Sequence, residues 1–154
     1  MKKIFAALLI MTLSAFTLTG CGTEKDSTNI PFSDFEWSAT QEEIEKTNGI
    51  STDAYDGIYG GKALVYDKQY QGLPGQVIYM FNTDGKLADI AWKTVNESDE
   101  VLTNLLDTVS SELTKTYGDK KFDNTAATAV GGKWEDGNIH ILVNKVDLGG
   151  TYVL

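Results

Sequence analysis

The sequence predicts an α+β fold, in which an antiparallel β-sheet carries two helices packed on one face. Three observations support this prediction. A short segment near residue 40 and a long segment from residue 98 have helical character, and apolar runs of strand length follow each of them. Tight turns rich in glycine, asparagine and aspartate separate those runs. We therefore expect the order α-βββ-α-βββ, give or take a strand, within one domain that spans residues 31–154.

The first helix is predicted from the residues at its two ends. Thr40 followed by Glu43 fits a capping box, in which each side chain hydrogen-bonds the backbone N–H of the other residue. Gln41–Lys46 is helix-forming sequence, and Asn48-Gly49 is a suitable C-cap. We expect a short helix that ends there.

The second helix is the clearest element of the chain. Ser98 or Asp99 is its predicted N-cap, and Gly118 its predicted end. Between them, apolar residues recur at the spacing that lines one helical face: Val101, Leu102, Leu105, Leu106, Val109, Leu113 and Tyr117. This face is expected to pack on the sheet.

Three strands are predicted between the helices, at Lys62–Gln71, Gln76–Phe81 and Leu87–Val95. The turn 72–75 separates the first two, and the loop 82–86 separates the last two, with Gly85 free to adopt a left-handed conformation. After the second helix, residues 119–132 are predicted to be a loop or weak strand. Trp134 and the turn 135–138 then lead into a strand at Ile139–Val146, and Thr151–Leu154 is the last short strand.

Short matches between the two halves indicate a tandem duplication. The matched pairs, in the same order in both halves, are 43–49 with 112–118, 60–62 with 131–133, and the apolar positions of 77–82 with those of 139–144. Lys-Thr and Gly-Gly pairs are common, so chance similarity remains the alternative.

Residues 1–20 have the organisation of an export signal. Lys2 and Lys3 form a basic start, Ile4–Leu13 is almost unbroken apolar sequence, and Ser14–Gly20 is small and polar. The apolar run is shorter than the roughly 20 residues that a bilayer-spanning helix takes. We expect this segment to be removed on export.

Leu18-Thr19-Gly20-Cys21 resembles the bacterial lipobox, in which two small residues separate a leucine from the cysteine at the cleavage site. The resemblance implies cleavage between Gly20 and Cys21 and a thioether-linked diacylglycerol on Cys21, with a further acyl group such as palmitate on the new amino terminus in many species. Cys21 is the only cysteine, and a thiolate is the nucleophile that this chemistry needs. An ordinary secretory signal that ends near a cysteine is the alternative.

The expected product is lipid-anchored in the cell membrane, on its extracytoplasmic face. Each buried CH₂ of the acyl chains contributes about 0.8 kcal/mol to this anchoring in the bilayer. Residues 22–30 are polar and show no hydrophobic pattern, so residues 21–30 are expected to form a lipidated cysteine and a flexible tether. The sequence leaves open whether the envelope is Gram-positive or Gram-negative.

The segment 37–44, followed by Asn48-Gly49, resembles the opening helix of small outer-membrane-assembly lipoproteins, whose fold is like that of beta-lactamase inhibitory protein. Residues 79–87 resemble the strand-turn-strand that follows in them. The chain departs from that family where the usual Gly-x-Pro is replaced by Asn48-Gly49-Ile50. Its general layout is also similar to that of uncharacterised surface lipoproteins of Gram-positive anaerobes. Both resemblances imply an antiparallel sheet with packed helices and a non-enzymatic binding role, and they assign no functional residue except Cys21.

The charge of the chain excludes one class of partner. Its 13 basic residues, all lysines, stand against 22 acidic ones, and the net charge is -9. Removal of residues 1–20 takes away two lysines and no acid, which lowers the net charge to −11. Such a surface repels phosphate backbones, so we expect no nucleic-acid partner. With 42% hydrophobic residues the chain is too apolar to be disordered.

Motifs for catalysis and cofactor binding are scarce. His140 is the only histidine, in a strand whose alternation places it opposite Ile139 and Ile141, and no Gly-x-Ser-x-Gly element accompanies it. One histidine and one lipidated cysteine do not make a usual zinc site, and the acidic clusters lack the spacing of a calcium loop. We expect no enzymatic activity, no metal and no cofactor. Because the chain has 22 acids, a pair of carboxylates suited to glycosidase chemistry is not excluded by the sequence.

Aromatic residues crowd the predicted sheet and the loop before it. The candidate binding residues among them are Tyr55, Tyr59, Tyr66, Tyr70 and Trp92. An exposed face of this composition, ringed with acids, would bind a cationic peptide, a glycan or another protein. Ordinary half-buried positions in strands are the alternative interpretation. The segment 55–61 is expected to be an exposed, mobile patch.

These observations predict a lipoprotein with a small non-catalytic domain that binds a ligand or a protein, such as an envelope protein or peptide. A small cell-envelope hydrolase, a dedicated protein inhibitor and a purely structural envelope component are the alternatives. An enzyme would show a carboxylate pair with a strongly raised pKa in a cleft. A binding domain would show an aromatic sheet face without such a pair.

Overall fold

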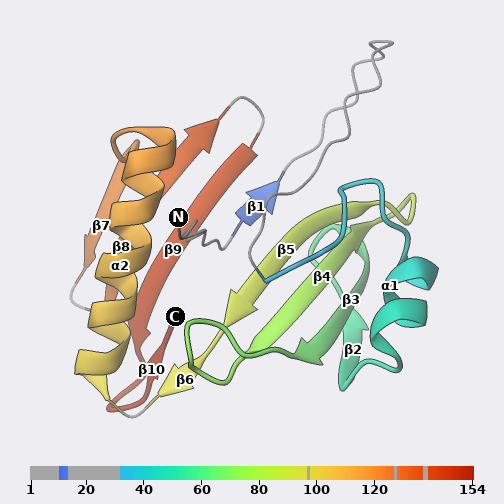
Figure 1. Ribbon diagram of the computed structural model, residues 1–154, viewed down its shortest axis with the longest axis horizontal. Coiled ribbons are helices and arrows are strands. Elements are labelled where there is room, and N and C mark those ends of the chain that lie inside the picture. The colour runs from blue at the N-terminus through green and yellow to red at the C-terminus, as the bar shows by residue number, and fades with distance from the viewer. Residues whose placement is uncertain (1–10, 14–31, 97, 127, 137–138) are drawn as a thin grey trace, which may run out of the picture.

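The computed structural model in Figure 1 confirms the predicted α+β class, with two helices and antiparallel strands. It describes residues 11–13 and 32–154, apart from residues 97, 127, 137 and 138. The helices are α1 (Gln41–Asn48) and α2 (Asp99–Tyr117). The strands are β1 (Met11–Leu13), β2 (Asp53–Asp56), β3 (Gly60–Asp67), β4 (Gln76–Asn82), β5 (Leu87–Lys93), β6 (Val95–Asn96), β7 (Phe122–Ala126), β8 (Ala129–Asp136), β9 (Ile139–Asp147) and β10 (Tyr152–Val153).

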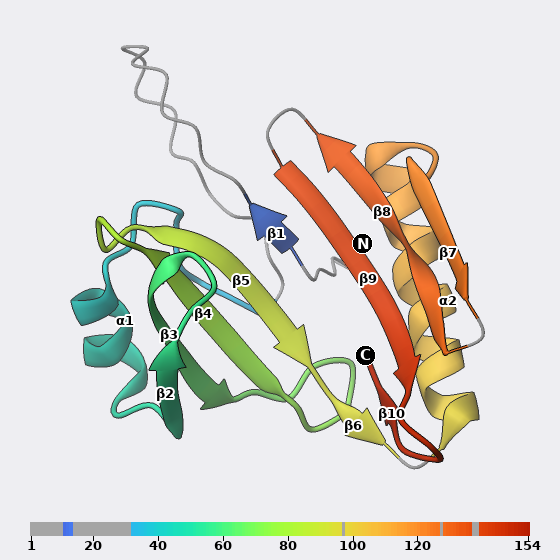
Figure 2. The same ribbon diagram turned by 180° about the vertical axis from the view of Figure 1, so that it is seen from behind.

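The strands form two antiparallel groups that β1 joins. The first group has the order β2-β3-β4-β5, and the second contains β7, β8, β9, β10 and β6. β1 lies between β5 and β9 and pairs antiparallel with both, so that all ten strands belong to one sheet. Figure 2, drawn from behind, shows β1 in the gap between these two long strands.

Helix α1 begins at the predicted capping box. Thr40 Oγ1 accepts a hydrogen bond from the Glu43 backbone N–H at 3.3 Å, and the Thr40 N–H donates to Glu43 Oε2 at 2.8 Å. This second bond is the main reason why the pKa of the Glu43 carboxyl lies below its usual value. The helix ends at Gly49, whose φ is 83°, as predicted. Ile44 is its fully buried contact with the core.

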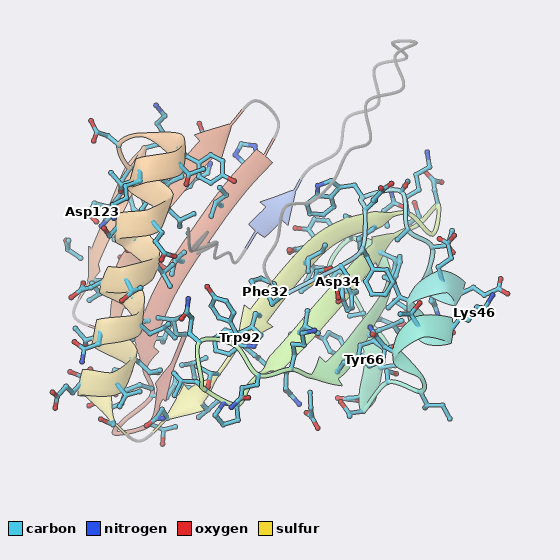
Figure 3. All side chains as sticks on the ribbon, viewed as in Figure 1. Phe32, Asp34, Lys46, Tyr66, Trp92 and Asp123 are labelled. Atoms are coloured by element: carbon cyan, nitrogen blue, oxygen red, sulfur yellow. The ribbon has the colours of Figure 1, made fainter. Side chains whose placement is uncertain are left out.

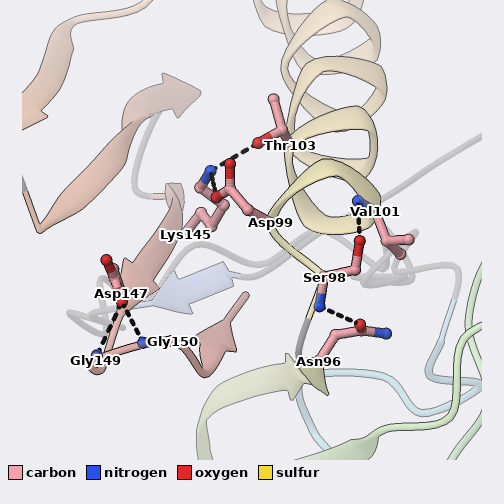
Figure 4. Close-up of polar contacts among 9 residues, drawn as sticks. All are labelled: Asn96, Ser98, Asp99, Val101, Thr103, Lys145, Asp147, Gly149 and Gly150. Carbon is pink, nitrogen blue, oxygen red and sulfur yellow. Dashed lines mark hydrogen bonds and ion pairs between the residues drawn. The ribbon is translucent and has the colours of Figure 1, made fainter.

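Helix α2 covers β8 and β9 (Figure 1). Ser98 caps it, and its buried face is formed by Leu102, Leu105, Leu106, Val109 and Leu113. Val101 was predicted to belong to this face but is 36% exposed, and Leu102 is the first buried residue of the helix. Lys145 of β9 holds the first turns of the helix through Asp99 Oδ1 at 2.5 Å and Thr103 Oγ1 at 2.6 Å (Figure 4).

Strand β2 lies outside the predicted elements, residues 119–132, predicted as a loop or weak strand, contain β7, and β3 is shorter than predicted at its C-terminal end. All four side chains of β2 and four of the five in β7 are exposed, so neither strand shows the alternation of a half-buried strand. Both lie at the outer ends of their groups and are held by pairing with β3 and β8. β3 stops at Asp67 rather than Gln71, because the chain turns there and Gln71 adopts a φ of 49°. The left-handed Gly85 is confirmed by its φ of 72°.

Besides a small cluster of Ala63, Val65 and Ile78 in the first strand group, the main hydrophobic core of the described residues serves both strand groups. It contains Ile44 of α1, the buried face of α2, and inward residues of both groups such as Tyr79, Ile90, Trp134 and Ile141. Its first described member along the chain is Phe32 and its last is Leu154. Residues of both strand groups therefore pack together in this core.

The two halves have the same arrangement, which supports the predicted duplication. Each consists of a helix followed by a four-stranded meander, α1 with β2–β5 and α2 with β7–β10. Gly49 and Gly118 end their helices with φ of 83° and 78°. Gly60 lies opposite Asn82, and Gly131 lies opposite Asn144, as the sequence matches require. The halves differ in helix length, 8 residues against 19.

Gly131→Ala is expected to destabilise the domain by about 2–3 kcal/mol, measured by urea unfolding of the mature chain. A Cβ at Gly131 would overlap the backbone oxygen of Val143 and lie 2.8 Å from the Asn144 Cα, and neither atom can move without disturbing the β8–β9 ladder. Gly132→Ala is the matched control. Its Cβ would first meet the flexible Lys120 side chain at 2.8 Å, so its cost should be smaller. Equal costs for the two variants would contradict this account.

Candidate binding site

A tyrosine and a buried aspartate meet on one side of the sheet. The chain between β2 and β3 turns tightly, with the Gly57 N–H donating to the Gly61 oxygen at 2.7 Å and the Gly60 N–H donating to the Gly57 oxygen at 3.1 Å. This turn places Tyr59 so that its hydroxyl donates to Asp89 Oδ2, on β5, at 3.3 Å. Two segments thirty residues apart therefore build this contact.

Asp89 is the most unusual acid in the described part of the chain. Its side chain is 1% exposed, and its Oδ1 has no hydrogen-bond partner among the described residues. Burial raises the pKa of its carboxyl to about 7, although hydrogen bonds from Tyr59 and the Ile90 backbone act in the opposite direction. Burial, and then the charge of Asp89, raises the pKa of Tyr59 to about 12. A buried, half-satisfied carboxyl of this kind is a common feature of functional sites.

Cross-strand register gives the region around β1 two different sides. Residue 12 of β1 is paired with Asp89 of β5 on one side and with His140 of β9 on the other. His140 is in turn paired with Glu135 of β8. The neighbouring row runs from Ile90 through residue 11 to Ile141 and Trp134. Directly opposed residues in an antiparallel ladder share a face. One side of the β1 position is therefore polar, and the other belongs to the core.

His140 lies on the polar side of β9, and its neighbour Ile141 lies on the core side, as the strand alternation predicted. About one third of its side chain is exposed, and its Nδ1 lies 3.2 Å from Glu135 Oε1. Lys133 Nζ lies 2.6 Å from the same oxygen. The bond from Lys133 is the largest reason why the pKa of Glu135 is lowered, and His140 adds to it. Glu135 is therefore an ionised group with two cationic or polar neighbours.

The five predicted aromatic residues do not form one exposed surface. Tyr66 and Trp92 are buried in the core, and they present little surface for the binding role predicted for them. Figure 3 shows Tyr66 beside α1 and Trp92 nearer the middle of the molecule. Tyr70 is partly buried and packs edge-on against Trp92, with ring centroids 5.3 Å apart. The inward face of the sheet is covered by the segment before α1 and by α2, so most of the surface of its aromatic residues is used in packing.

Tyr55 and Tyr59 are the two that remain accessible. Tyr55, on β2, is 41% exposed, and Tyr59 is partly buried by its contact with Asp89. Ile58 between them is 80% exposed, so the segment 55–61 presents an accessible apolar and aromatic surface, as predicted.

A pocket of about 390 Å³ opens beside the C-terminal end of α1. Its lining includes Tyr66, Tyr79, Asn48 and the exposed Ile50, with Asp67 as its single carboxylate. A neighbouring pocket of about 300 Å³ shares Ile50 and contains Glu45. Asp89 lines neither pocket. These two pockets provide polar and apolar contacts, and each has a single carboxylate in its lining.

Metal-binding clusters and membrane-spanning helices are both absent from the described residues. No three histidine, cysteine, aspartate or glutamate side chains gather there in a way that could hold a metal ion. In the same part of the chain, no helix is long and apolar enough to cross a membrane. Cys21, Gly20 and the predicted tether lie outside the described residues.

Comparison with known proteins adds no family to these observations. No protein-family model, no curated protein and no solved structure matches the chain significantly.

Sequence reasoning missed Asp89, although a signal was present. The acid stands inside the apolar run Leu87-Ala88-Asp89-Ile90, where both neighbours predict a strand. A charged residue in such a run is buried only with a partner or with a shifted pKa. The partner, Tyr59, belongs to a turn whose position depends on the pairing of β2 with β3, which the sequence analysis did not predict.

Proposed function

We propose that this protein is a membrane-anchored extracytoplasmic lipoprotein whose α+β domain binds a protein or peptide partner and does not transform it. One observation carries the proposal: the lipobox-like Leu18-Thr19-Gly20-Cys21 ends eleven residues before Phe32, the first described residue of the core. Cleavage and acylation at Cys21 would therefore leave this core intact. The intervening ten residues span at most about 35 Å, which keeps the domain near the membrane.

The site geometry favours binding over catalysis. The acid with the strongly raised pKa, Asp89, contacts a tyrosine hydroxyl rather than a second carboxylate. Glycosidase and aspartic-protease chemistry both require two carboxyl groups that share a substrate. The accessible Tyr55 and Ile58, on a strongly acidic domain, instead supply the contacts of a protein-binding surface. A hydrolase is thus the weaker alternative.

Cys21→Ala is expected to abolish lipidation and membrane anchoring. The intact mass of wild-type protein extracted from membranes should correspond to a chain that begins at Cys21 and carries a diacylglyceryl group. The Cys21→Ala protein should remain unprocessed or be released, because the nucleophile is gone. Ser14→Ala, which leaves the lipobox unchanged, is the control. A soluble wild-type product without lipid, cut elsewhere, would refute the anchoring proposal.

A further inference from the structure

We propose that the position of β1, between β5 and β9, is a peptide-binding slot in the mature protein. It would accept an extended segment of a basic partner protein in which an apolar residue is followed by a basic one. The inference rests on the proposed function, because only removal of residues 1–20 takes β1 out of the sheet. The geometry of the slot, the chemistry of its two sides and the charge of the domain each support it.

The slot is bounded by two strands that are already paired on their other sides. β5 pairs with β4 from Gln76 to Phe81, and β9 pairs with β8 along Ala129–Asp136. Residues 11 and 12 pair antiparallel with both strands at once, and residue 13 pairs with β9 alone, so one extended segment lies between the two strands. β10 pairs with β9 only at Val146 and Asp147, well away from this region. Once β1 is removed, two rows of backbone N–H and C=O groups lack a partner, as in strands that recruit a peptide by β-addition.

The two sides of the slot define what an occupant must carry. On the core side, Ile90 and Ile141 flank the position of residue 11 and are fully buried. A polar side chain there would lose its hydration without gaining a partner, so this position requires an apolar residue.

The opposite side requires a hydrogen-bond donor. Asp89 and His140 flank the position of residue 12, and Glu135 lies beyond His140. Asp89 Oδ1 is buried and has no hydrogen-bond partner in the described part of the chain. A lysine or arginine at the middle position of an occupant would donate to this oxygen, and charge-assisted bonds of this kind are among the strongest. The cation would also favour the ionised form of Asp89, whose pKa burial raises to about 7.

The charge of the domain selects a basic partner over a second copy of the chain. The mature chain has a net charge of −11, so two copies repel each other, whereas a basic segment is attracted. The segment 55–61 reaches the same side of the sheet through Tyr59 and adds an accessible contact area beside the slot.

The experiment uses mature protein from membranes, in mild detergent, and fluorescent peptides of residues 9–15 with a solubilising tail. One peptide carries Thr12→Lys and the matched control carries Thr12→Glu. We expect the Thr12→Lys peptide to bind at least about tenfold more tightly, the size of one charge-assisted hydrogen bond. Hydrogen exchange should slow in Leu87–Ala91 and Ile139–Leu142 and not in β2 or β7. In the Asp89→Asn protein this preference should largely disappear, whereas Asp123→Asn, which removes an exposed acid on β7, should retain it.

Three results would overturn the proposal. The first is no binding of either peptide to folded mature protein, or binding without protection of β5 and β9. The second is protection of these strands that grows with protein concentration, which would assign the slot to a second copy. The third is protection in the free protein at every concentration, which would mean that β5 closes onto β9. Failure of the proposed function has a separate signature, because it appears as loss of anchoring in the Cys21 experiment.

Discussion

Trp134→Ala is expected to lower the free energy of unfolding of the mature chain by about 3–5 kcal/mol. Trp134 is fully buried on β8, and its Nε1 donates to the Thr114 hydroxyl of α2 at 3.3 Å. The substitution removes a fully buried side chain that contacts α2 from the second strand group, and it leaves a cavity. Urea unfolding followed by circular dichroism measures the effect, and Trp37→Ala, at a partly buried position on the edge of the core, is the control with a smaller expected loss.

The same variant tests whether the two halves unfold together. Because one core contains residues of both strand groups, Trp134→Ala should weaken hydrogen-exchange protection in β4 as well as in β9. Loss of protection confined to β7–β10 would contradict a single core and would indicate two separable repeats.

The helices could be predicted because their signals are local. The Thr40–Glu43 capping box, the Ser98 cap and the apolar spacing of α2 each lie within a few residues, and all three are found in the structure. Hairpin turns gave equally local signals, as at Gly85. Strand β2, which was not predicted, and β7, predicted only as a loop or weak strand, have no such signal, because an outer strand with exposed side chains is specified by its neighbour rather than by its own pattern.

The binding residues were harder to predict because strand alternation separates two faces without telling which one is covered. Tyr66 and Trp92 lie on the face that the segment before α1 and α2 cover, with Phe35 packed edge-on against Tyr79 at 5.4 Å. Only the tertiary fold makes them core residues. Asp89 illustrates the converse, since its significance depends on Tyr59, on a turn thirty residues earlier, and on the register of β1.

Asp89→Asn is expected to make the domain more stable at neutral pH, and the gain should depend on pH. The unfolded chain releases the proton of Asp89 near pH 3.8, whereas the folded chain, with β1 in place, holds it up to a pKa of about 7. Between these values the folded state binds more protons than the unfolded state, so its stability falls as pH rises. Below pH 4 both states are protonated and the contribution vanishes. Above pH 7 the cost is constant, of the order of 4 kcal/mol.

Urea unfolding between pH 4 and 8 measures this difference in Cys21→Ala chains that retain residues 1–20, with Asp89 intact or replaced by asparagine. The two curves should meet near pH 4 and separate toward pH 7, with the asparagine variant the more stable. Asp56→Asn is the control, because Asp56 is exposed beside Lys62, its pKa is lowered, and it titrates below this range. Curves that stay parallel across the range would show that Asp89 is ionised in the folded protein.

Comparing chains with and without residues 1–20 shows how much of the burial of Asp89 is due to β1 and how much to the rest of the domain. In a Cys21→Ala chain that retains residues 1–20, β1 lies beside β5, and the full pH dependence is expected. In the mature chain an empty slot admits water to the carboxylate, so its pKa should fall toward the usual value and the slope should become shallower. A Thr12→Lys peptide would then stabilise the ionised carboxylate, and peptide affinity should increase as pH rises through the pKa of Asp89 in the free mature protein. An affinity independent of pH across that range would show that the peptide does not interact with the Asp89 carboxylate, even if it binds between β5 and β9.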